Sequence, residues 1–434
     1  MAKITVNPSL KTIIDQNVDI FVSNLPSYQD ITFRAQTIDD SETVFESFAY
    51  YRADENGEVS LVSQPSLGGS YTGVEPMGLF WSMEPVEGTD RDDMLRKRDV
   101  TKPLKVSLDV YSGVRIGGNN SMSLEENNKL ASVTLLRSYM SDRVTRHVVE
   151  SGGFYGTFFI PSGDGLFPGI YYLMLSFFVG VIDIWGFTGG LREDRAALLA
   201  ANGFAVLALA YCAFKDLPER YGLLQVSYFE SAIDWLTSQP KVKSGGVGLV
   251  GLSNGGTLAL ALAAQLGQKV KAVVSISGYP MLIGCSLASH TMTIPGYPVD
   301  LDPSKGSCYS QFLAIFTSKE ICKIGSPWTI PVEHICCPVL LVYGLADQLV
   351  PDIEWMCEEI VRRMQQNGKE SLCQKLALPG ASHFITPCYI PPCSRKYIKV
   401  FDEMWLIGGN DKPLFAKSCK QYWSKSLEFL FKYI

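Results

Sequence analysis

Apolar and polar residues alternate in short segments along the first 140 residues. Four such segments are separated by turn-forming stretches such as "DENGE", "PSLGGSYTG" and "GGNNS"; they span residues 18–25, 31–38, 44–53 and 104–113. Alternation with a period of two predicts half-buried strands, because successive side chains of a strand point to opposite faces. Short strands with frequent turns predict an all-β sandwich over residues 1–140.

From about residue 145 the pattern changes to nearly continuous apolar segments that alternate with amphipathic ones. Strands that are apolar at consecutive positions are buried on both faces, as in parallel sheets covered by helices. We therefore expect an α/β domain over residues 141–434. Its predicted strands are residues 203–211, 246–252, 271–277 and 338–344, and its predicted helices are residues 223–239, 255–266 and 353–366.

The predicted strand at 246–252 leads into Gly251-Leu252-Ser253-Asn254-Gly255, which matches the pattern G-x-S-x-G. Between a strand and a helix, this pattern is typical of a nucleophilic serine held on a sharp turn at the sheet edge. Its glycines leave room for the neighbouring strand and helix, which bulkier residues would hit. Ser253 is the predicted nucleophile. The alternative is a Gly-Ser turn that only lets a helix start close to the sheet.

A serine nucleophile needs a base, and the base needs a third group to orient it. In hydrolases with this turn, the order along the chain is serine, acid, histidine. Asp347 follows the apolar strand at 338–344, and His383 follows the short segment "QKLALPG". Both are expected at the sheet edge that carries Ser253, where open α/β folds place their ligands.

Other acids and histidines fit this order less well. His147 precedes the predicted parallel strands, and His290 and His334 precede the acid, so a surface or lid position is predicted for each. Asp352 could replace Asp347 as the acid. It lies at a predicted helix start, however, where an N-cap role also accounts for it.

Charge develops on the acyl oxygen only during the reaction, so fixed backbone N–H groups are needed to stabilise it. Asn254 follows the nucleophile at the positive end of its helix, which makes its N–H one expected donor. The second donor is expected from the loop after "VIDIWG", where Phe187 is the candidate by position. The glycines around Phe187 also fit a plain strand-to-helix turn.

Composition narrows the function classes. The 434 residues include 38 Lys and Arg against 44 Asp and Glu, so no basic excess points to a nucleic-acid partner. The 11 cysteines and 4 histidines lack the spacing of a zinc site, and neither a metal nor a prosthetic cofactor is expected. The N-terminus is unlike a signal or transit peptide, and the C-terminus is unlike a peroxisomal address. The expectation is a cytosolic protein with reduced cysteines.

A run of 18 uncharged residues lies between Asp164 and Asp183. Its length is near the minimum for a membrane span. Because Pro168 lies near its start and the run continues into "DIWGFTGG", buried strands are expected rather than a stable membrane span.

Several longer stretches are more distinctive than the catalytic spacing. They are "YRADENGE", "PSLGGSYTGVEPMGLFWSMEP", "DIWGFTGGLREDRAALLAANGFAVLALAYCAFKDLP", "GVGLVGLSNGG", "SHFITPCYIPPC" and "GGNDKP". Through them the chain resembles the type I acyl-CoA thioesterases and the related bile acid-CoA:amino acid N-acyltransferases over nearly its whole length.

The resemblance implies an immunoglobulin-like β-sandwich followed by an α/β-hydrolase domain. It also implies a substrate with a fatty acyl or related acyl group on coenzyme A, which enters as part of the substrate and not as a cofactor. The family's triad of Ser or Cys, Asp and His falls on Ser253, Asp347 and His383, the residues that the motif analysis also selects.

Three positions depart from the family pattern. The amino-acid-conjugating branch typically has Cys where this chain has Ser253, so the serine favours hydrolysis with water as the acceptor. Asn254 stands where many thioesterases have Lys, a change that leaves a backbone donor unaffected. Residues 170–180, "IYYLMLSFFVG", are extra before the "VIDIWG" strand, as an insertion or a translated intron. If real, this segment perturbs the strand that aims the Phe187 loop.

Three functions fit these features. The first is an acyl-CoA thioesterase of fatty acyl metabolism. The alternatives are an acyl-CoA:amino acid N-acyltransferase, against which Ser253 counts, and a non-catalytic acyl-CoA-binding paralogue, which only the insertion supports.

"RKR" at 96–98 fits either a contact with coenzyme A phosphates or an exposed basic turn. Residues 280–335 are expected to cover the site and shape an acyl pocket. A monomer is expected.

Overall fold

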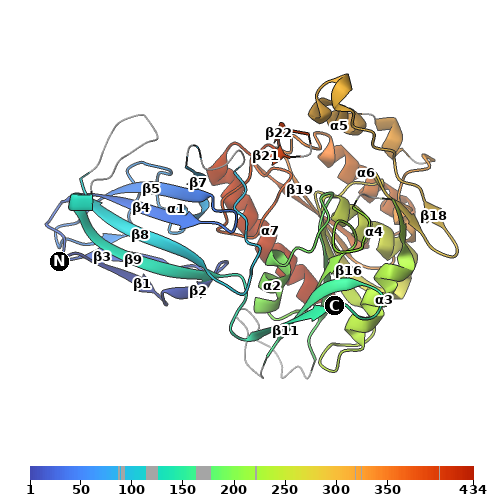
Figure 1. The fold of residues 1–434 in the computed structure, drawn as a ribbon, viewed down its shortest axis with the longest axis horizontal. Coiled ribbons are helices and arrows are strands. Elements are labelled where there is room, and N and C mark those ends of the chain that lie inside the picture. Colours follow the sequence, from blue (N-terminus) through green and yellow to red (C-terminus); the bar gives the residue numbers. More distant parts are fainter. Residues whose placement is uncertain are drawn as a thin grey trace. The chain divides into compact units, whose positions relative to one another are not determined.

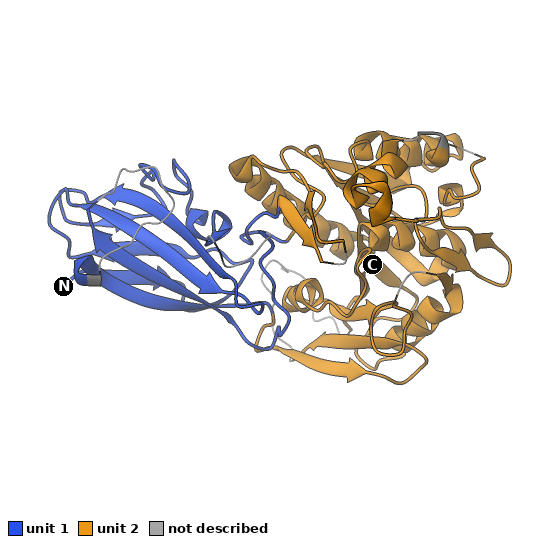
Figure 2. Cartoon of the chain, turned by 45° about the horizontal axis from the view of Figure 1, so that its top comes forward, with its two compact units in different colours: residues 1–139, 387–393 blue, residues 140–386, 394–434 orange. Residues whose placement is uncertain are grey.

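The computed structural model describes residues 1–86, 88, 93–113, 126–162, 177–219, 222–317, 319–323, 325–399 and 401–434. They form two compact units, which Figure 2 distinguishes by colour. Unit 1 comprises Met1–Tyr139 and Pro387–Cys393, and unit 2 comprises Met140–Thr386 and Ser394–Ile434. Residues 387–393 were predicted to lie in the second domain, but in the structure this segment belongs to unit 1.

The described residues of unit 1 form two β-sheets (Figure 1). One sheet has the strand order β1-β3-β6 and the other has the order β2-β9-β8-β4-β5-β7. The four strands expected from alternation are β3, β4, β5 and β8. The elements are β1 (Lys3–Asn7), β2 (Lys11–Ile13), β3 (Asp19–Ser23), β4 (Asp30–Ile38), β5 (Val44–Arg52), β6 (Val59–Ser60), α1 (Gly78–Trp81), β7 (Glu84–Pro85), β8 (Leu104–Ser112), the 3₁₀ turn η1 (Glu126–Asn128) and β9 (Lys129–Ser138).

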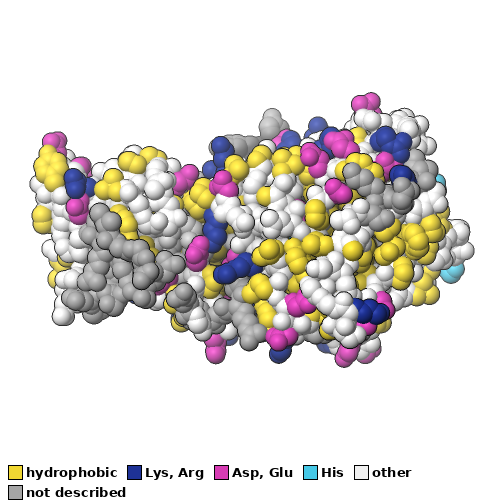
Figure 3. Space-filling model, turned by 90° about the horizontal axis from the view of Figure 1, so that it is seen from above, with side chains coloured by type: hydrophobic (Ala, Val, Ile, Leu, Met, Phe, Trp, Pro, Cys, Tyr) yellow, Lys and Arg dark blue, Asp and Glu magenta, His cyan; other side chains and the backbone are white. Residues whose placement is uncertain are grey.

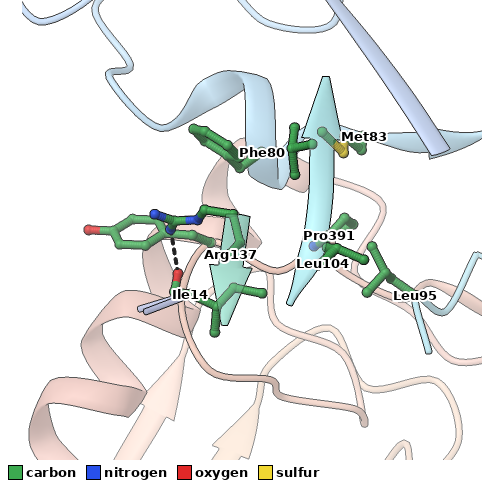
Figure 4. Close-up of a pocket in the computed structure, with 9 residues that line it drawn as sticks. Ile14, Phe80, Met83, Leu95, Leu104, Arg137 and Pro391 are labelled. Atoms are coloured by element: carbon green, nitrogen blue, oxygen red, sulfur yellow. Dashed lines mark hydrogen bonds between the residues drawn. The ribbon is translucent and has the colours of Figure 1, made fainter. Parts of the chain in front are cut away.

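A buried cation lies beside a small cavity in unit 1 (Figure 4). Arg137 is 1% exposed, and its guanidinium donates to Thr12 Oγ1 at 2.6 Å and to the carbonyl oxygens of Ile14 and Gln16 at 2.7 and 2.9 Å. It also lies 5.0 Å from the ring centroid of Phe80. Burial lowers the pKa of Arg137 to about 10. The guanidinium thus connects β9 to β2 and to the segment that follows β2.

Replacing Arg137 with alanine is expected to lower the free energy of unfolding by about 2–4 kcal/mol, because three hydrogen bonds and the Phe80 contact are lost. Arg137→Lys is expected to recover only part of this, since an ammonium cannot reproduce a planar fork. Denaturant unfolding is the measurement. The control is Arg52→Ala, which breaks an exposed ion pair with Asp30. If Arg137→Ala and Arg52→Ala lowered the free energy of unfolding by the same small amount, the stabilising role of Arg137 would be contradicted.

The basic triplet at 96–98 is used within unit 1. Lys97 Nζ lies 2.7 and 2.8 Å from the two carboxylate oxygens of Asp40, and its side chain is only 3% exposed. The backbone N–H of Arg98 donates to the same carboxylate at 2.7 Å. Lys97 is therefore engaged by Asp40 rather than presented to a phosphate, and the suggested phosphate contact is wrong for this residue.

Unit 2 contains a sheet with the strand order β10-β11-β13-β12-β15-β16-β19-β20. β11 is antiparallel to both of its neighbours, and every pair from β13 to β20 is parallel. This is the α/β-hydrolase arrangement, as expected. The strands are β10 (Val144–Val149), β11 (Tyr155–Pro161), β12 (Gly180–Ile184), β13 (Ala205–Ala210), β15 (Val247–Leu252), β16 (Val270–Ile276), β19 (Val339–Gly344) and β20 (Cys373–Leu378).

Helices cover both faces of this sheet (Figure 1). One apolar cluster joins α3, α4 and α6 to Ile182 and Leu249 of the sheet. On the opposite face Asp183 pairs with Arg195 of α2 at 2.6 Å, and Tyr422 of α7 interacts with this pair. The helices are α2 (Asp194–Ala201), α3 (Val226–Thr237), α4 (Asn254–Leu266), α5 (Cys308–Thr317), α6 (Ile353–Gln366) and α7 (Lys412–Tyr433).

The segment between β16 and β19 is mostly irregular, as expected for residues 280–335, and it contributes α5 and two short strands. The minor elements of unit 2 are β14 (Leu223–Gln225), β17 (Ser286–Ala288), β18 (Thr293–Ile294), β21 (Arg395–Ile398), β22 (Glu403–Leu406) and the 3₁₀ turns η2 (Gly267–Lys269), η3 (Pro303–Lys305), η4 (Lys319–Cys322), η5 (Val332–His334) and η6 (Glu370–Leu372).

The end of the long apolar run forms strand structure. β12 is buried throughout and pairs in parallel with β13 and β15, and Phe178 just before it bridges to Val242. Residues 163–176, which include much of the extra segment, lie outside the described residues. Among the residues that the structure describes, no helix is long and apolar enough to cross a membrane.

Charged side chains of both signs are intermixed on the face shown in Figure 3. Lys and Arg side chains lie among Asp and Glu side chains there, and the chain as a whole has a net charge of −6. An extended basic surface, the usual footprint of nucleic-acid binding, is therefore not seen on this face within the described part of the chain.

Candidate active site

Ser253 occupies a sharp turn between β15 and α4. Its φ and ψ angles are 57° and −126°, a left-handed conformation that costs a non-glycine residue about 1–3 kcal/mol. The Ser253 N–H donates to the carbonyl of Ile276 on β16 at 2.7 Å, and the Ser253 carbonyl accepts from Thr257 at 3.0 Å. These two bonds fix the strained turn at the carboxyl end of the sheet.

The glycines of the motif are required by close approach of the backbone. A Cβ atom added at Gly251 would lie 2.1 Å from the carbonyl oxygen of Gly255, and one added at Gly255 would lie 2.4 Å from that of Ile184. Real Cβ atoms essentially never come so close to other atoms. The strand and helix can meet at this angle only without side chains at these positions, which agrees with the sequence-based reading of the motif.

Gly251→Ala is expected to destabilise the fold by about 3 kcal/mol or more, because the added methyl meets backbone rather than a movable side chain. The measurement is the midpoint of thermal or denaturant unfolding. The control is Gly222→Ala, since a Cβ at Gly222 meets nothing within 4 Å. A Gly251→Ala protein as stable as the Gly222→Ala protein would contradict the packing argument.

The structure brings Ser253, His383 and Asp347 together. Ser253 Oγ lies 2.8 Å from His383 Nε2, and His383 Nδ1 lies 2.7 Å from Asp347 Oδ2. Ser253 is 8% exposed, His383 1% and Asp347 6%. The hydroxyl of Ser277 also donates to the His383 carbonyl at 2.9 Å, which holds the histidine backbone. The spacing fits a proton relay in which the carboxylate orients the imidazole.

Asp347 is itself held in place. Its Oδ1 accepts from the backbone N–H groups of Leu349 and Val350 at 2.9 and 2.8 Å, so Oδ2 is the oxygen left for His383. Asp352 precedes α6, but its side chain makes no capping hydrogen bond. Asp352 thus lies at the N-cap position of α6, as expected, but the capping hydrogen bond expected from its side chain is not formed.

The three remaining histidines lie away from this cluster. His147 is on the edge strand β10, His290 follows β17 and His334 ends η5, and all three are exposed. Among the described residues, no group of three or more His, Cys, Asp or Glu side chains is placed to hold a metal ion.

Asn254 begins α4, where its backbone N–H belongs to the first turn and has no partner within the helix. Its side chain is fully buried. The amide nitrogen donates to Cys285 Sγ at 3.6 Å, and the amide oxygen accepts from the hydroxyl of Tyr279 at 3.4 Å. The side chain is thus engaged in packing, which leaves the backbone N–H as the group suited to an oxyanion.

Asn254→Ala is expected to change kcat by less than about tenfold, because the backbone N–H remains at the start of the helix. The free energy of unfolding should fall by about 1–3 kcal/mol, since the buried Tyr279 hydroxyl loses its acceptor. Steady-state kinetics and denaturant unfolding test both parts. A kcat loss of 100-fold or more without loss of stability would mean that the side chain acts in catalysis.

Phe187 lies in the loop after β12, which passes beside the nucleophile. A Cβ atom added at Gly186 would lie 3.1 Å from Ser253 Cβ. The Phe187 ring is half-buried and meets the ring of Phe312 of α5 edge-on, with centroids 6.1 Å apart. β12 is paired on both sides, so the strand that aims this loop is in place despite the extra residues before it.

Two buried residues beside the start of α4 were not predicted from the sequence: Tyr279, which contacts Ser253 and Asn254, and Cys285, which contacts Asn254. Burial raises the pKa of Tyr279, with a hydrogen bond to Ser253 opposing the shift, and burial raises the pKa of Cys285 to about 12. Cys285 therefore stays a neutral thiol near neutral pH and does not compete with Ser253 as a nucleophile. The sequence feature that could have indicated Tyr279 is its position just after β16, which ends at the same sheet edge as Ser253.

Models of one protein family match both parts of the chain. Residues 15–151 match the "Acyl-CoA thioester hydrolase/BAAT N-terminal region", and residues 224–434 match the "BAAT / Acyl-CoA thioester hydrolase C terminal". The chain belongs to the acyl-CoA thioester hydrolase/BAAT family. This membership agrees with the resemblance found from the sequence.

Several named members of this family align with nearly the whole chain. The "Peroxisomal succinyl-coenzyme A thioesterase" of Mus musculus is 35% identical and covers 100% of this chain and 97% of its own. The "Acyl-coenzyme A amino acid N-acyltransferase 1" of Mus musculus is 33% identical, with coverages of 100% and 98%. The "Acyl-coenzyme A thioesterase 2, mitochondrial" of Rattus norvegicus is 36% identical, with coverages of 95% and 85%.

Proposed function

We propose that this protein is an acyl-CoA thioesterase that cleaves an acyl-CoA to a free acid and coenzyme A through an ester on Ser253. The observation that carries the proposal is the pair of short contacts that link Ser253 Oγ to His383 Nε2 and His383 Nδ1 to Asp347 Oδ2. The names of the two thioesterase relatives support coenzyme A thioesters as the substrate class.

In the first step, His383 Nε2 takes the proton of Ser253 Oγ as that oxygen attacks the thioester carbonyl. Asp347 keeps the imidazole oriented and stabilises its positive charge. Backbone N–H groups of Asn254 and Phe187 are proposed to receive the developing oxyanion. The carbon–sulfur bond then breaks, and the departing sulfur takes the proton from His383. Because thiols have a pKa of about 8.5, this leaving group needs less protonation than an alcohol would.

In the second step, water attacks the serine ester. His383 removes a proton from the water and returns it to Ser253 Oγ when the carbon–oxygen bond of the ester breaks. The acid leaves and the starting state is restored. The proposed steps use only side chains and backbone groups of this chain, and coenzyme A takes part only as a portion of the substrate.

An amino acid N-acyltransferase is the second candidate, because a relative with that name matches this chain about as well as the thioesterases do. In that reaction, an amine would replace water as the acceptor of the acyl group. Serine at 253 favours water, since an oxygen ester is less reactive toward amines than a thioester. A non-catalytic paralogue has less support, because Ser253, His383 and Asp347 lie within hydrogen-bonding distance of one another in turn and β12 is paired.

The relatives' names include both peroxisomal and mitochondrial proteins, so family membership does not specify a compartment. The cytosolic location stays a prediction, as does the monomeric state.

The proposal is tested by the fate of the acyl group. Purified protein is incubated with a series of saturated, dicarboxylic and bile acyl-CoAs, with and without glycine or taurine, and thiol release and acyl products are both measured. Thiol release without an amine, yielding free acid, is the expected result. Thiol release that requires the amine and yields an amide would favour the acyltransferase instead.

A further inference from the structure

The hydroxyl of Tyr211 connects β13 to the loop that carries Phe187. Its one proton is shared between the carbonyl oxygens of Trp185 and Gly186, which lie 3.0 and 3.1 Å from the hydroxyl oxygen. Tyr211 directly follows β13 and is 2% exposed, within the main apolar cluster of unit 2. We propose that Tyr211 is a positioning residue that fixes the Phe187 N–H for oxyanion stabilisation. This inference rests on the proposed function.

The argument follows from the planarity of the peptide group. In a trans peptide the C=O and the N–H point in opposite directions, and the Gly186 carbonyl shares its peptide with the Phe187 N–H. Fixing the Gly186 carbonyl therefore fixes the direction of the Phe187 N–H. The Tyr211 hydroxyl contacts that carbonyl and the one before it, so it restrains two successive peptides ahead of the proposed donor.

Backbone hydrogen bonds also hold the loop, and the Tyr211 hydroxyl adds a side-chain contact that reaches the Gly186 carbonyl directly. The Gly189 N–H also donates to the Gly186 carbonyl at 3.0 Å, and the Gly190 N–H donates to the Cys212 carbonyl at 2.9 Å. The first bond lies within the loop, and the second anchors its far end. Donors that stabilise a transition state must be oriented before charge appears, because reorientation during the reaction costs energy.

The test compares buried Tyr211 with half-buried Tyr228, because their hydroxyl groups bond to different segments of the chain. Tyr211→Phe removes one oxygen and its bonds to the loop. The matched control is Tyr228→Phe, which removes a hydroxyl that donates to the Ala210 carbonyl at 2.6 Å and accepts from Tyr155 N–H at 3.1 Å. The control variant therefore loses two hydrogen bonds, one of them to Ala210 next to Tyr211 in the chain, and neither bond involves the Phe187 loop.

Tyr211→Phe is expected to lower kcat by about 10–100-fold with KM changed less than about threefold, as for a weakened oxyanion donor. Tyr228→Phe is expected to change both by less than about threefold. Rates are normalised to active sites titrated with a fluorophosphonate, and thermal unfolding is recorded, so loss of folded protein is not counted as loss of catalysis.

A second readout separates oxyanion stabilisation from general loosening. A medium-chain alkyl trifluoromethyl ketone adds the serine oxygen and presents an oxyanion, whereas an S-alkyl-CoA thioether has no reactive carbonyl. Tyr211→Phe should weaken binding of the ketone in proportion to the loss in kcat and leave thioether binding unchanged. Equal effects on both ligands, or a kcat equal to that of Tyr228→Phe, would overturn the inference.

The Ser253→Ala variant then shows how far such a failure extends. If Ser253→Ala retains full turnover, the proposed function fails together with the inference. If Ser253→Ala loses turnover, only the role of Tyr211 is rejected.

Discussion

Ser253→Ala is expected to lower kcat for acyl-CoA hydrolysis by about 10⁴–10⁶-fold, with thermal stability nearly unchanged. The serine oxygen lies 2.8 Å from His383 Nε2 and is the only atom proposed to bond to the acyl carbon in the first step. Its removal leaves backbone donors and substrate binding, which alone give only a small residual rate. Thiol release under saturating acyl-CoA is the measurement.

The control for this variant is Ser275→Ala, on the neighbouring strand β16. Ser275 is also buried, and its hydroxyl has no hydrogen-bond partner in the described structure. It should keep kcat within about threefold of the wild type, as expected for a change that breaks no contact with the triad. If Ser253→Ala retained more than about a tenth of wild-type kcat, the nucleophile would have to be another group.

Asp347→Asn is expected to lower kcat by about 10⁴-fold while the fold is kept, because it forces the wrong tautomer of His383. The side-chain carbonyl oxygen of an asparagine would keep the two N–H bonds from Leu349 and Val350. Its NH₂ group would then face His383 Nδ1, which would have to act as acceptor. The ring proton would move to Nε2, and Nε2 could no longer accept the proton of Ser253.

Asp352→Asn is the control that tests whether the loss of kcat is specific to position 347. Asp352 lies five residues further on, at the start of α6, and its side chain makes no capping bond. Its substitution should leave kcat and the unfolding midpoint close to the wild type. An Asp347→Asn protein with kcat within tenfold of wild type, or an Asp352→Asn protein with the larger loss, would contradict the assignment of the acid.

The parts of the site that the sequence predicts are those set by local geometry. A sharp turn between a buried strand and a helix needs glycines at fixed offsets, so Gly251 and Gly255 locate Ser253 from the sequence alone. Parallel strands place their carboxyl ends at one edge, so residues that follow such strands are expected to meet there. Asp347 and His383, far apart in the chain, were located by this rule.

The parts that sequence does not predict depend on contacts between distant segments. Residues 387–393 belong to unit 1, although they follow the strands of unit 2 in the chain. Lys97 lies in a basic triplet that resembles a surface site, yet its ammonium is buried against Asp40. Tyr211 and Tyr279 occupy apolar surroundings like any core tyrosine, and only the placement of their hydroxyl groups shows their connection to the site.

The most direct test of the account is detection of the acyl-enzyme. The protein is mixed with its best acyl-CoA substrate, quenched in acid within milliseconds and digested, and its peptides are analysed by mass spectrometry. The account predicts that the acyl mass appears on the peptide containing Ser253 during turnover and that this adduct is absent from the Ser253→Ala protein. Coenzyme A release with no acyl adduct at any time, or an adduct on a cysteine such as Cys285, would contradict it.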